Sequence, residues 1–293
     1  MKSSTKLDDQ RTDIAQRLTP LVRRVLAPNP SAFTFTGTQT YIVGPNTRGG
    51  EVAVIDPGPA DPAHIDGILA VTEGERIIAI ICTHTHRDHS PAAAPLKAAT
   101  GAQIIGCVPL TLEDDGPRAD AAFDTTYAPD RVLTDGERVT GPGWTLETVA
   151  TPGHTSNHLC FHLIEENALF TGDHVMGWST TVVSPPDGDM ADYMRSLDRL
   201  MARSDAVYYP AHGEPVTKPQ QFVRGLAGHR KQRERQILRM LESGEGVIAD
   251  MVPKMYAGID ERLYGAAGRS VLAHLIDLRD RGQVREGAAW TLA

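Results

Sequence analysis

The sequence predicts an α/β fold in which two sheets are covered by helices, followed by a smaller helical region at the C-terminus. Short apolar segments of strand length alternate with segments of helical periodicity as far as residue 217. Histidine or aspartate follows several of these strands directly. After residue 217 the strand pattern stops and helical segments follow one another. We therefore predict two domains, at residues 1–217 and 218–293.

The predicted elements of the first domain come in a regular order. Residues 40–43 and 52–55 alternate between apolar and polar side chains like paired strands, and residues 60–71 form a helix. Further strands are predicted at residues 77–82, 103–106, 146–149, 159–163 and 168–171. A helix over residues 189–203 carries apolar side chains on one face.

Three histidines and a carboxylate follow the strand predicted at residues 77–82. His84 and His86 are two residues apart on an extended segment, so both side chains point to the same side of the chain. One histidine near a strand end is common, but several polar groups packed behind a core strand are costly without a partner. The spacing therefore predicts a metal site rather than a solvated loop.

A helix is predicted to begin directly after this cluster. Ser90 suits the N-cap, Pro91 the first helical position and Gly101 the residue that ends the helix. Asp88 and His89 then lie where the chain turns from loop into helix, beside the point that the first two histidines face. The arrangement indicates two neighbouring cations that share a cluster of ligands.

Three further candidate ligands lie far along the chain. His154, Asp173 and His212 each lie at the end of an apolar strand, where ligand sites are common. A lone histidine or aspartate in that position is more often a cap or part of a solvated turn. Together with the first cluster, these residues form a set that the simpler interpretation does not explain.

The seven residues resemble the signature of the metallo-β-lactamase superfamily, His-x-His-x-Asp-His followed by a distant His, Asp and His. The resemblance implies an αββα sandwich that holds a dinuclear metal centre. It implies a first metal site of His84, His86 and His154, and a second of Asp88, His89 and His212, with Asp173 bridging. This set suits Zn²⁺, two ions per chain, and Mn²⁺ or Fe²⁺ would bind to the same ligands.

A narrower resemblance extends over most of the chain. Similarity to the lactamase-beta-like subfamily is found at residues 29–34, 37–44, 55–58 and 177–181 and in the tail that starts at residues 228–230. Gln39 departs from it, because relatives usually have asparagine there. The best-known animal member is a mitochondrial endoribonuclease that acts on single-stranded RNA, and fungal relatives hydrolyse polyketide thioesters from carrier proteins. The resemblance also implies a winged-helix-like module at the C-terminus.

The second domain fits such a module. Helices are predicted at residues 220–241, 247–256 and 269–281, and a hairpin at residues 283–292. Residues 218–293 hold 13 Lys or Arg against 9 Asp or Glu, whereas residues 1–217 hold 16 against 28, so a mildly basic tail follows an acidic body. The first helix carries Arg224, Arg230, Lys231, Arg233, Arg235 and Arg239. These side chains would contact phosphates in a bound RNA, but the net charge of -8 favours a solvated helix face.

Residues near the later ligands are candidates for substrate contact. The candidates are Trp178, Ser179, Thr180, Thr181 and Tyr193. The segment 178–181 follows Asp173 closely enough to line a pocket, and the alternative is a loop packed beneath the site with Trp178 in the core. Tyr193 either reaches the substrate or is buried. His158 is predicted to form a hydrogen bond behind the ligands rather than to bind a metal.

The predicted activity follows from the metals. Two cations that share a water lower its pKa and generate a bridging hydroxide near neutral pH. Asp88 would also orient this nucleophile and is the predicted catalytic residue. We expect hydrolysis of an ester or thioester of a small or carrier-bound acyl group, with β-lactam hydrolysis as a side activity. The alternatives are an endoribonuclease on single-stranded RNA and a nucleic-acid-binding regulator with a vestigial hydrolase body.

The composition is typical of a cytoplasmic enzyme. No apolar stretch approaches the length needed to cross a bilayer, so no membrane partner is predicted. Residues 1–16 are rich in aspartate and lack the apolar core of a signal peptide. Cys82, Cys107 and Cys160 lie in or beside apolar segments, which indicates buried free thiols in a reducing compartment. We therefore expect a cytoplasmic protein rather than a secreted antibiotic-destroying enzyme.

Overall fold

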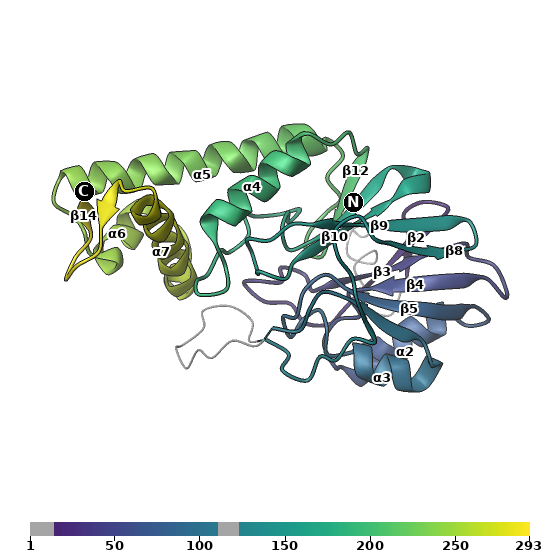
Figure 1. Cartoon of the computed structure of the whole chain (residues 1–293). Coiled ribbons are helices and arrows are strands. Elements are labelled where there is room, and N and C mark those ends of the chain that lie inside the picture. Colours follow the sequence, from purple (N-terminus) through teal and green to yellow (C-terminus); the bar gives the residue numbers. More distant parts are fainter. Residues whose placement is uncertain (1–14, 111–122) are drawn as a thin grey trace, which may run out of the picture.

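Two sheets lie face to face with helices on their outer sides in the computed structural model, which describes residues 15–110 and 123–293 (Figure 1). The prediction that the chain carries no signal peptide depends on residues 1–16. Residues 1–14 of this segment lie outside the described residues. Within the described part of the chain, no helix combines the length and the apolarity needed to span a membrane. The three cysteines are buried and unpaired, as predicted.

The first sheet holds seven strands in sequence order. They are β1 (Gln16–Arg17), β2 (Val22–Leu26), β3 (Gln39–Val43), β4 (Glu51–Ile55), β5 (Arg76–Cys82), β6 (Gln103–Gly106) and β7 (Arg131–Val132). Strands β1 to β4 pair antiparallel, and β4 to β7 pair parallel. The parallel connections contain α2 (Pro62–Val71) and α3 (Ala93–Thr100), which contribute Ile68 and Leu96 to the core. β5 is therefore covered on both faces, which explains its continuous apolar sequence.

The second sheet holds five strands, with β11 paired parallel to β12 and the other pairs antiparallel. They are β8 (Arg138–Gly141), β9 (Trp144–Ala150), β10 (Leu159–Leu163), β11 (Ala168–Gly172) and β12 (Val207–Pro210). Alternate side chains face opposite ways. Phe161 and Phe170 pack between the sheets, whereas Cys160 and Leu169 pack against α4 (Met190–Met201).

The C-terminal region has its own hydrophobic core. It contains α5 (Pro219–Glu242), α6 (Ile248–Met255), a short 3₁₀ turn (Glu261–Leu263), α7 (Tyr264–Asp280), β13 (Val284–Arg285) and β14 (Thr291–Leu292). The first half of α5 packs on α4 through Val223 and Leu226, and its second half joins the C-terminal core through Ile237. A single long helix thus belongs to both regions (Figure 1). The boundary at residues 217 and 218 stays a prediction.

One local expectation is wrong, and one strand was not predicted. The helix predicted from Ser90 begins at Ala93, without a side-chain cap, because the Ser90 hydroxyl donates instead to Asp124 at 2.9 Å. Gly101 ends this helix with a φ of 73°, as predicted. Strand β2 escaped prediction because two arginines interrupt its apolar pattern. One of them, Arg23, is nevertheless buried, with an ion pair to Glu75 at 2.8 Å.

Candidate metal centre

The seven candidate ligands meet where the C-terminal ends of strands from both sheets come together. β5 leads to the first cluster, β9 to His154, β11 to Asp173 and β12 to His212. The backbone at Gly172 packs closely against two side chains of the site. An added Cβ would lie 2.6 Å from His158 Nε2 and 2.8 Å from Thr83 Oγ1. A glycine is needed there, and it lets the chain place the Asp173 carboxylate in the centre.

The first triad consists of His84, His86 and His154, whose ligand atoms lie within 4.8 Å of one another. His86 Nδ1 is 3.0 Å from His84 Nε2 and 3.1 Å from His154 Nε2. All three side chains are buried. Three imidazole nitrogens therefore face one common point, which is the donor arrangement that transition-metal cations prefer.

The second triad consists of Asp88, His89 and His212. Asp88 Oδ2 is 3.2 Å from His89 Nε2 and 3.1 Å from His212 Nε2. Asp173 lies between the two triads. Its Oδ1 is 3.3 Å from His212 Nε2, and its Oδ2 is 3.8 Å from His154 Nε2. The carboxylate thus presents one oxygen to each triad.

Hydrogen bonds behind the cluster hold the imidazole rings. Asp56, which sequence reasoning did not single out as a functional residue, lies with Oδ2 3.0 Å from His89 Nδ1, and its Oδ1 accepts from the Thr83 amide at 2.8 Å. The outer nitrogen of His154 is 2.7 Å from the Val182 carbonyl oxygen. Such contacts fix the ring orientation and leave the inner nitrogen free for a ligand bond. The signal available in the sequence was Asp56 itself, placed directly after the apolar strand β4.

Two other predicted features lie in this outer layer. His158 accepts a hydrogen bond from the Asp173 amide at 3.2 Å, and its Nδ1 is 2.9 Å from Thr151 Oγ1. It therefore lies behind Asp173, and its role in holding a ligand stays a prediction. Gln39, the departure from the subfamily pattern, donates to the Gly213 carbonyl and so holds the loop that carries His212.

The pKa values of the histidines are shifted in opposite directions in the two triads. Burial, and then the neighbouring His154 imidazole, lower the pKa of His86 to about 3, so this ring is neutral with a free lone pair. Burial opposes protonation of His212 as well, but Asp173 and Asp88 outweigh it and raise the pKa of His212 to about 10. The carboxylates at the second triad therefore favour positive charge on their neighbours, whether a proton on His212 or a bound cation supplies it.

The donor set fits a bound divalent cation. His89 Nε2 and Asp173 Oδ1 are buried, and their nearest charged neighbours, at 3.2 and 3.3 Å, do not meet them in hydrogen-bond geometry. A buried polar atom without a partner is costly, and a cation coordinated at the cluster would supply one. Imidazole and carboxylate donors together suit Zn²⁺, Mn²⁺ or Fe²⁺.

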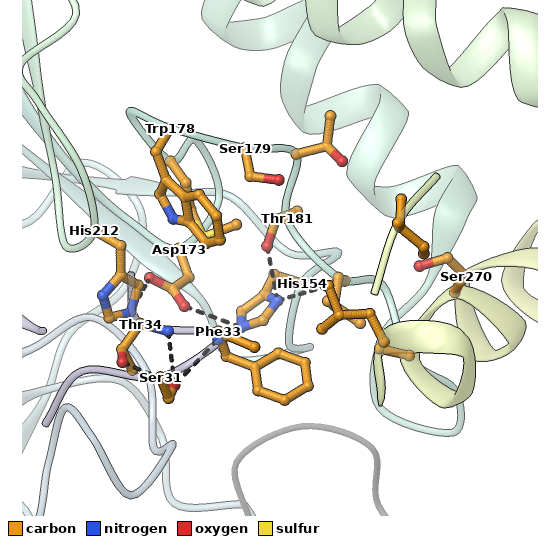
Figure 2. Close-up of a pocket in the computed structure, with 18 of the residues that line it drawn as sticks. Ser31, Phe33, Thr34, His154, Asp173, Trp178, Ser179, Thr181, His212 and Ser270 are labelled. Atoms are coloured by element: carbon orange, nitrogen blue, oxygen red, sulfur yellow. Dashed lines mark hydrogen bonds and ion pairs between the residues drawn. The ribbon is translucent and has the colours of Figure 1, made fainter. Parts of the chain in front are cut away.

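A cavity of about 570 Å³ opens from the cluster. His86, Asp88, His154, Asp173 and His212 line one end. The walls include residues 31–34 and 178–182, and the opposite side comes from the C-terminal region (Figure 2). Figure 2 shows Ser270, from α7, across the cavity from His154. The C-terminal region therefore completes the site rather than lying apart from it.

Four of the five candidate substrate-binding residues line the cavity, and one does not. Those that line the cavity are Trp178, Ser179, Thr180 and Thr181. Trp178 is 38% exposed and stacks on Phe35, with ring centroids 4.9 Å apart, so the alternative of a core tryptophan is wrong. Tyr193 does not reach the cavity. It is fully buried on the inner face of α4, and its hydroxyl donates to the His174 carbonyl at 3.3 Å.

Most residues on the opposite wall of the cavity were not predicted from the sequence to belong to the site. The residues there are His229, Arg230, Arg233, Tyr256, Ile259, Leu263, Ala266, Ala267 and Ser270. Arg230 and Arg233 belong to the basic series that was expected to form a solvated face. The available signal was their spacing, since Arg230 follows the buried Val223 and Leu226 at helical intervals.

Comparisons with known proteins agree with this architecture. The family model described as the metallo-beta-lactamase superfamily matches residues 33–212, and that of the beta-lactamase associated winged helix domain matches residues 248–290. An atrochrysone carboxyl ACP thioesterase of Aspergillus chevalieri is 36% identical over 231 residues, which are 77% of this chain and 67% of that protein. A beta-lactamase-like protein 2 homolog of Drosophila melanogaster is 32% identical over 286 residues, 92% of this chain and 91% of that protein.

Solved structures share the fold. A beta-lactamase domain protein from Burkholderia ambifaria superposes with a TM-score of 0.79 at 20% identity, covering 96% of this chain and 94% of that one. A metallo-beta-lactamase family protein from Thermus thermophilus gives a TM-score of 0.72 at 21% identity, covering 94% and 100%. The αββα sandwich and the C-terminal winged helix predicted from the sequence are thereby confirmed.

Proposed function

Because the chain belongs to the metallo-β-lactamase superfamily of hydrolases, we propose that it is a dinuclear metal-dependent hydrolase of acyl esters or thioesters. One observation carries this proposal. Two ligand triads share the Asp173 carboxylate at the end of a largely apolar cavity. Such a site combines a place for cations with a place for an apolar acyl group.

The proposed ligands are those of the two triads. His84, His86 and His154 would hold the first cation; Asp88, His89 and His212 would hold the second, with Asp173 between them. When bound, the cations would lower the pKa of a water to give hydroxide near neutral pH and would polarise the substrate carbonyl. Zinc is the metal we propose, and the same donors accept manganese or iron.

Side chains around the cluster would orient the attacking water and hold the substrate. Asp88 lines the cavity, and its Oδ2 accepts a hydrogen bond from Thr38 Oγ1 at 3.2 Å. We assign to this carboxylate the orientation of the attacking water. Thr181 lies beside the first triad, with its hydroxyl 3.1 Å from His154 Nδ1. Trp178, Ile259 and Leu263 offer apolar surface that would exclude water and hold an acyl chain.

An acyl substrate is favoured over RNA for two reasons. Four of the six basic residues on α5 are exposed and do not line the cavity, and the chain carries a net charge of -8. A strand of RNA would need a basic path to the cluster, because neutralised phosphates dominate such binding. The relative named as an ACP thioesterase supports a carrier-bound acyl group. The complete donor set argues against a regulator with a vestigial hydrolase body.

A panel assay tests the proposal. Protein loaded with zinc or manganese is offered N-acetylcysteamine thioesters, lactones, a chromogenic β-lactam and single-stranded RNA. We expect saturable thioester or ester hydrolysis that a chelator abolishes and that Asp88→Asn reduces strongly. A variant at an exposed carboxylate, Asp135→Asn, is the control. RNA cleavage without turnover of any acyl substrate would refute the proposal.

A further inference from the structure

Two arginines of α5 line the cavity without a carboxylate partner. Arg230 is only 3% exposed, and its guanidinium lies 5.0 Å from the centre of the Tyr193 ring. One of its nitrogens donates to the Thr181 carbonyl at 2.6 Å, but Nε has no hydrogen-bonding partner. Arg233 lies 4.2 Å from the centre of the Tyr256 ring, and its Nε is buried and unpartnered as well.

The other buried arginine among the described residues is paired with an acid. Arg23, equally buried, forms its ion pair with Glu75. Glu234, the nearest acid in sequence to Arg233, pairs instead with Arg281. A buried charge without a counter-ion is strongly unfavourable, so a protein keeps one where a ligand supplies the opposite charge. Neither Arg230 nor Arg233 has an anionic partner within residues 15–110 and 123–293.

The surroundings are suited to an anion. His229 also lines the cavity, and burial followed by Arg230 and Arg233 lowers its pKa to about 4, so the ring is neutral near pH 7. Arginine offers a planar fork of donors that matches the oxygens of a carboxylate or phosphate. The neighbouring wall includes Ile259, Leu263, Ala266 and Ala267 and, among the described residues, contains no carboxylate that would compete for the two guanidinium groups.

We propose that Arg230 and Arg233 form an anion-binding subsite that selects acyl substrates carrying a carboxylate or phosphate group. The proposal rests on the function proposed above. Thr181 connects the subsite to the cluster, because its carbonyl accepts from Arg230 while its hydroxyl contacts His154.

Paired substrates provide the test. The acyl arm compares the N-acetylcysteamine thioester of glutarate with that of its neutral methyl ester. The second arm compares pentanoyl phosphopantetheine with pentanoyl pantetheine, which lacks the phosphate. We expect Arg230→Gln and Arg233→Gln to lower kcat/KM for the anionic member of one pair by about tenfold to a hundredfold, leaving its neutral member little changed. The pair that responds identifies the source of the anion.

Control variants distinguish a loss of anion binding from a loss of folding. Arg235→Gln with Arg239→Gln removes two exposed charges from the same helix and should leave both ratios unchanged. If Arg230→Gln fails to fold, Arg230→Lys and Arg233→Gln carry the test, and the lysine should keep part of the preference. An anionic-to-neutral ratio that stays the same in these variants overturns the subsite.

A binding measurement separates this proposal from the one before it. Glutarate or inorganic phosphate should raise the unfolding temperature of the metal-loaded parent, and less so that of the arginine variants. If this difference appears but no thioester is hydrolysed, the subsite stands and the proposed function fails. If neither anion distinguishes the parent from the variants, the subsite is refuted, whatever the enzyme hydrolyses.

Discussion

Among single residues, Asp173 has the largest expected effect on metal content, because its two oxygens face different triads. We expect the parent protein to bind close to two metal equivalents, since seven donors exceed what one tetrahedral ion uses. Asp173→Ala should lower occupancy at both positions, to about one equivalent or less. Elemental analysis after gentle purification measures this, with Asp135→Ala as an exposed control. Full metal content and full activity in Asp173→Ala would show that this carboxylate is not a bridge.

Asp88 separates catalysis from stability. Asp88→Asn removes the charge that orients the nucleophile, so turnover should fall by roughly a hundredfold or more. The same change removes the carboxylate that pairs with His89 and His212 when no metal is bound, so the metal-free variant should be somewhat less stable than the parent but still folded. Thermal unfolding with chelator and activity with metal are measured on the same preparation. A variant that is unfolded with chelator present would assign Asp88 a structural role.

Asp56 shows how a residue outside the donor set contributes to it. Its carboxylate contacts His89 Nδ1 on one side and the Thr83 amide on the other. Asp56→Asn should weaken metal binding by about tenfold to a hundredfold, as is usual when a group that orients a metal ligand is removed. A competition titration with a chromophoric chelator measures this affinity. Unchanged affinity would show that the His89 ring is held by packing alone.

Among the elements, α5 performs two roles along one helix. Its inward face carries Arg230 to the cavity, whereas Lys231, Arg235 and Arg239 point to solvent. If RNA were the substrate, these exposed charges would guide it. The salt dependence of cleavage would then flatten by about 0.7 in log–log slope for each lost phosphate contact.

We expect instead that neutralising Lys231, Arg235 and Arg239 changes RNA cleavage little. The acidic body repels a polyanion, so cleavage in the parent should already be slow. Rates with single-stranded RNA and with a neutral thioester, each measured from low to high salt, decide the question. A steep salt dependence in the parent that the triple variant abolishes would promote the nuclease over the acyl hydrolase.

For the whole molecule, stability should fall in mild acid. Burial, and then Arg230, lower the pKa of His274 in α7 to about 3, and neither ring nitrogen has a hydrogen-bonding partner among the described residues. The unfolded chain takes up a proton near pH 6.5, and the folded chain does so only near pH 3. The free energy of unfolding therefore falls as pH decreases below 6.5, by about 1.4 kcal/mol per pH unit from this residue.

His274→Leu should remove this contribution. A leucine fills similar space without an unpartnered imidazole, so the variant should be at least as stable near pH 5 and lose less stability between about pH 6.5 and 5. Denaturant unfolding at several pH values, with chelator present, measures the difference. A parent and a variant with the same pH dependence would show that the imidazole finds a partner or water in solution.

The donor set could be predicted from the sequence because it depends on local spacing. His84 and His86 share a side because a strand repeats every two residues, and Asp88 and His89 follow within the same turn. The later ligands could be predicted because each follows an apolar strand that ends at the same edge. The layered fold followed from the order of apolar segments, which is also a property of neighbouring residues.

Other features depended on contacts between residues far apart in the chain. Tyr193 and Arg230 both lie on amphipathic helices, but only the packing of α4 against α5 buries the first and turns the second toward the cavity. Asp56 became part of the site because β4 pairs with β5, which brings its carboxylate to His89. Periodicity identifies the face of a helix that is buried, but it does not identify what that face meets. The opposite wall of the cavity, and the unpartnered arginines in it, therefore became visible only once the C-terminal region was packed against the sandwich.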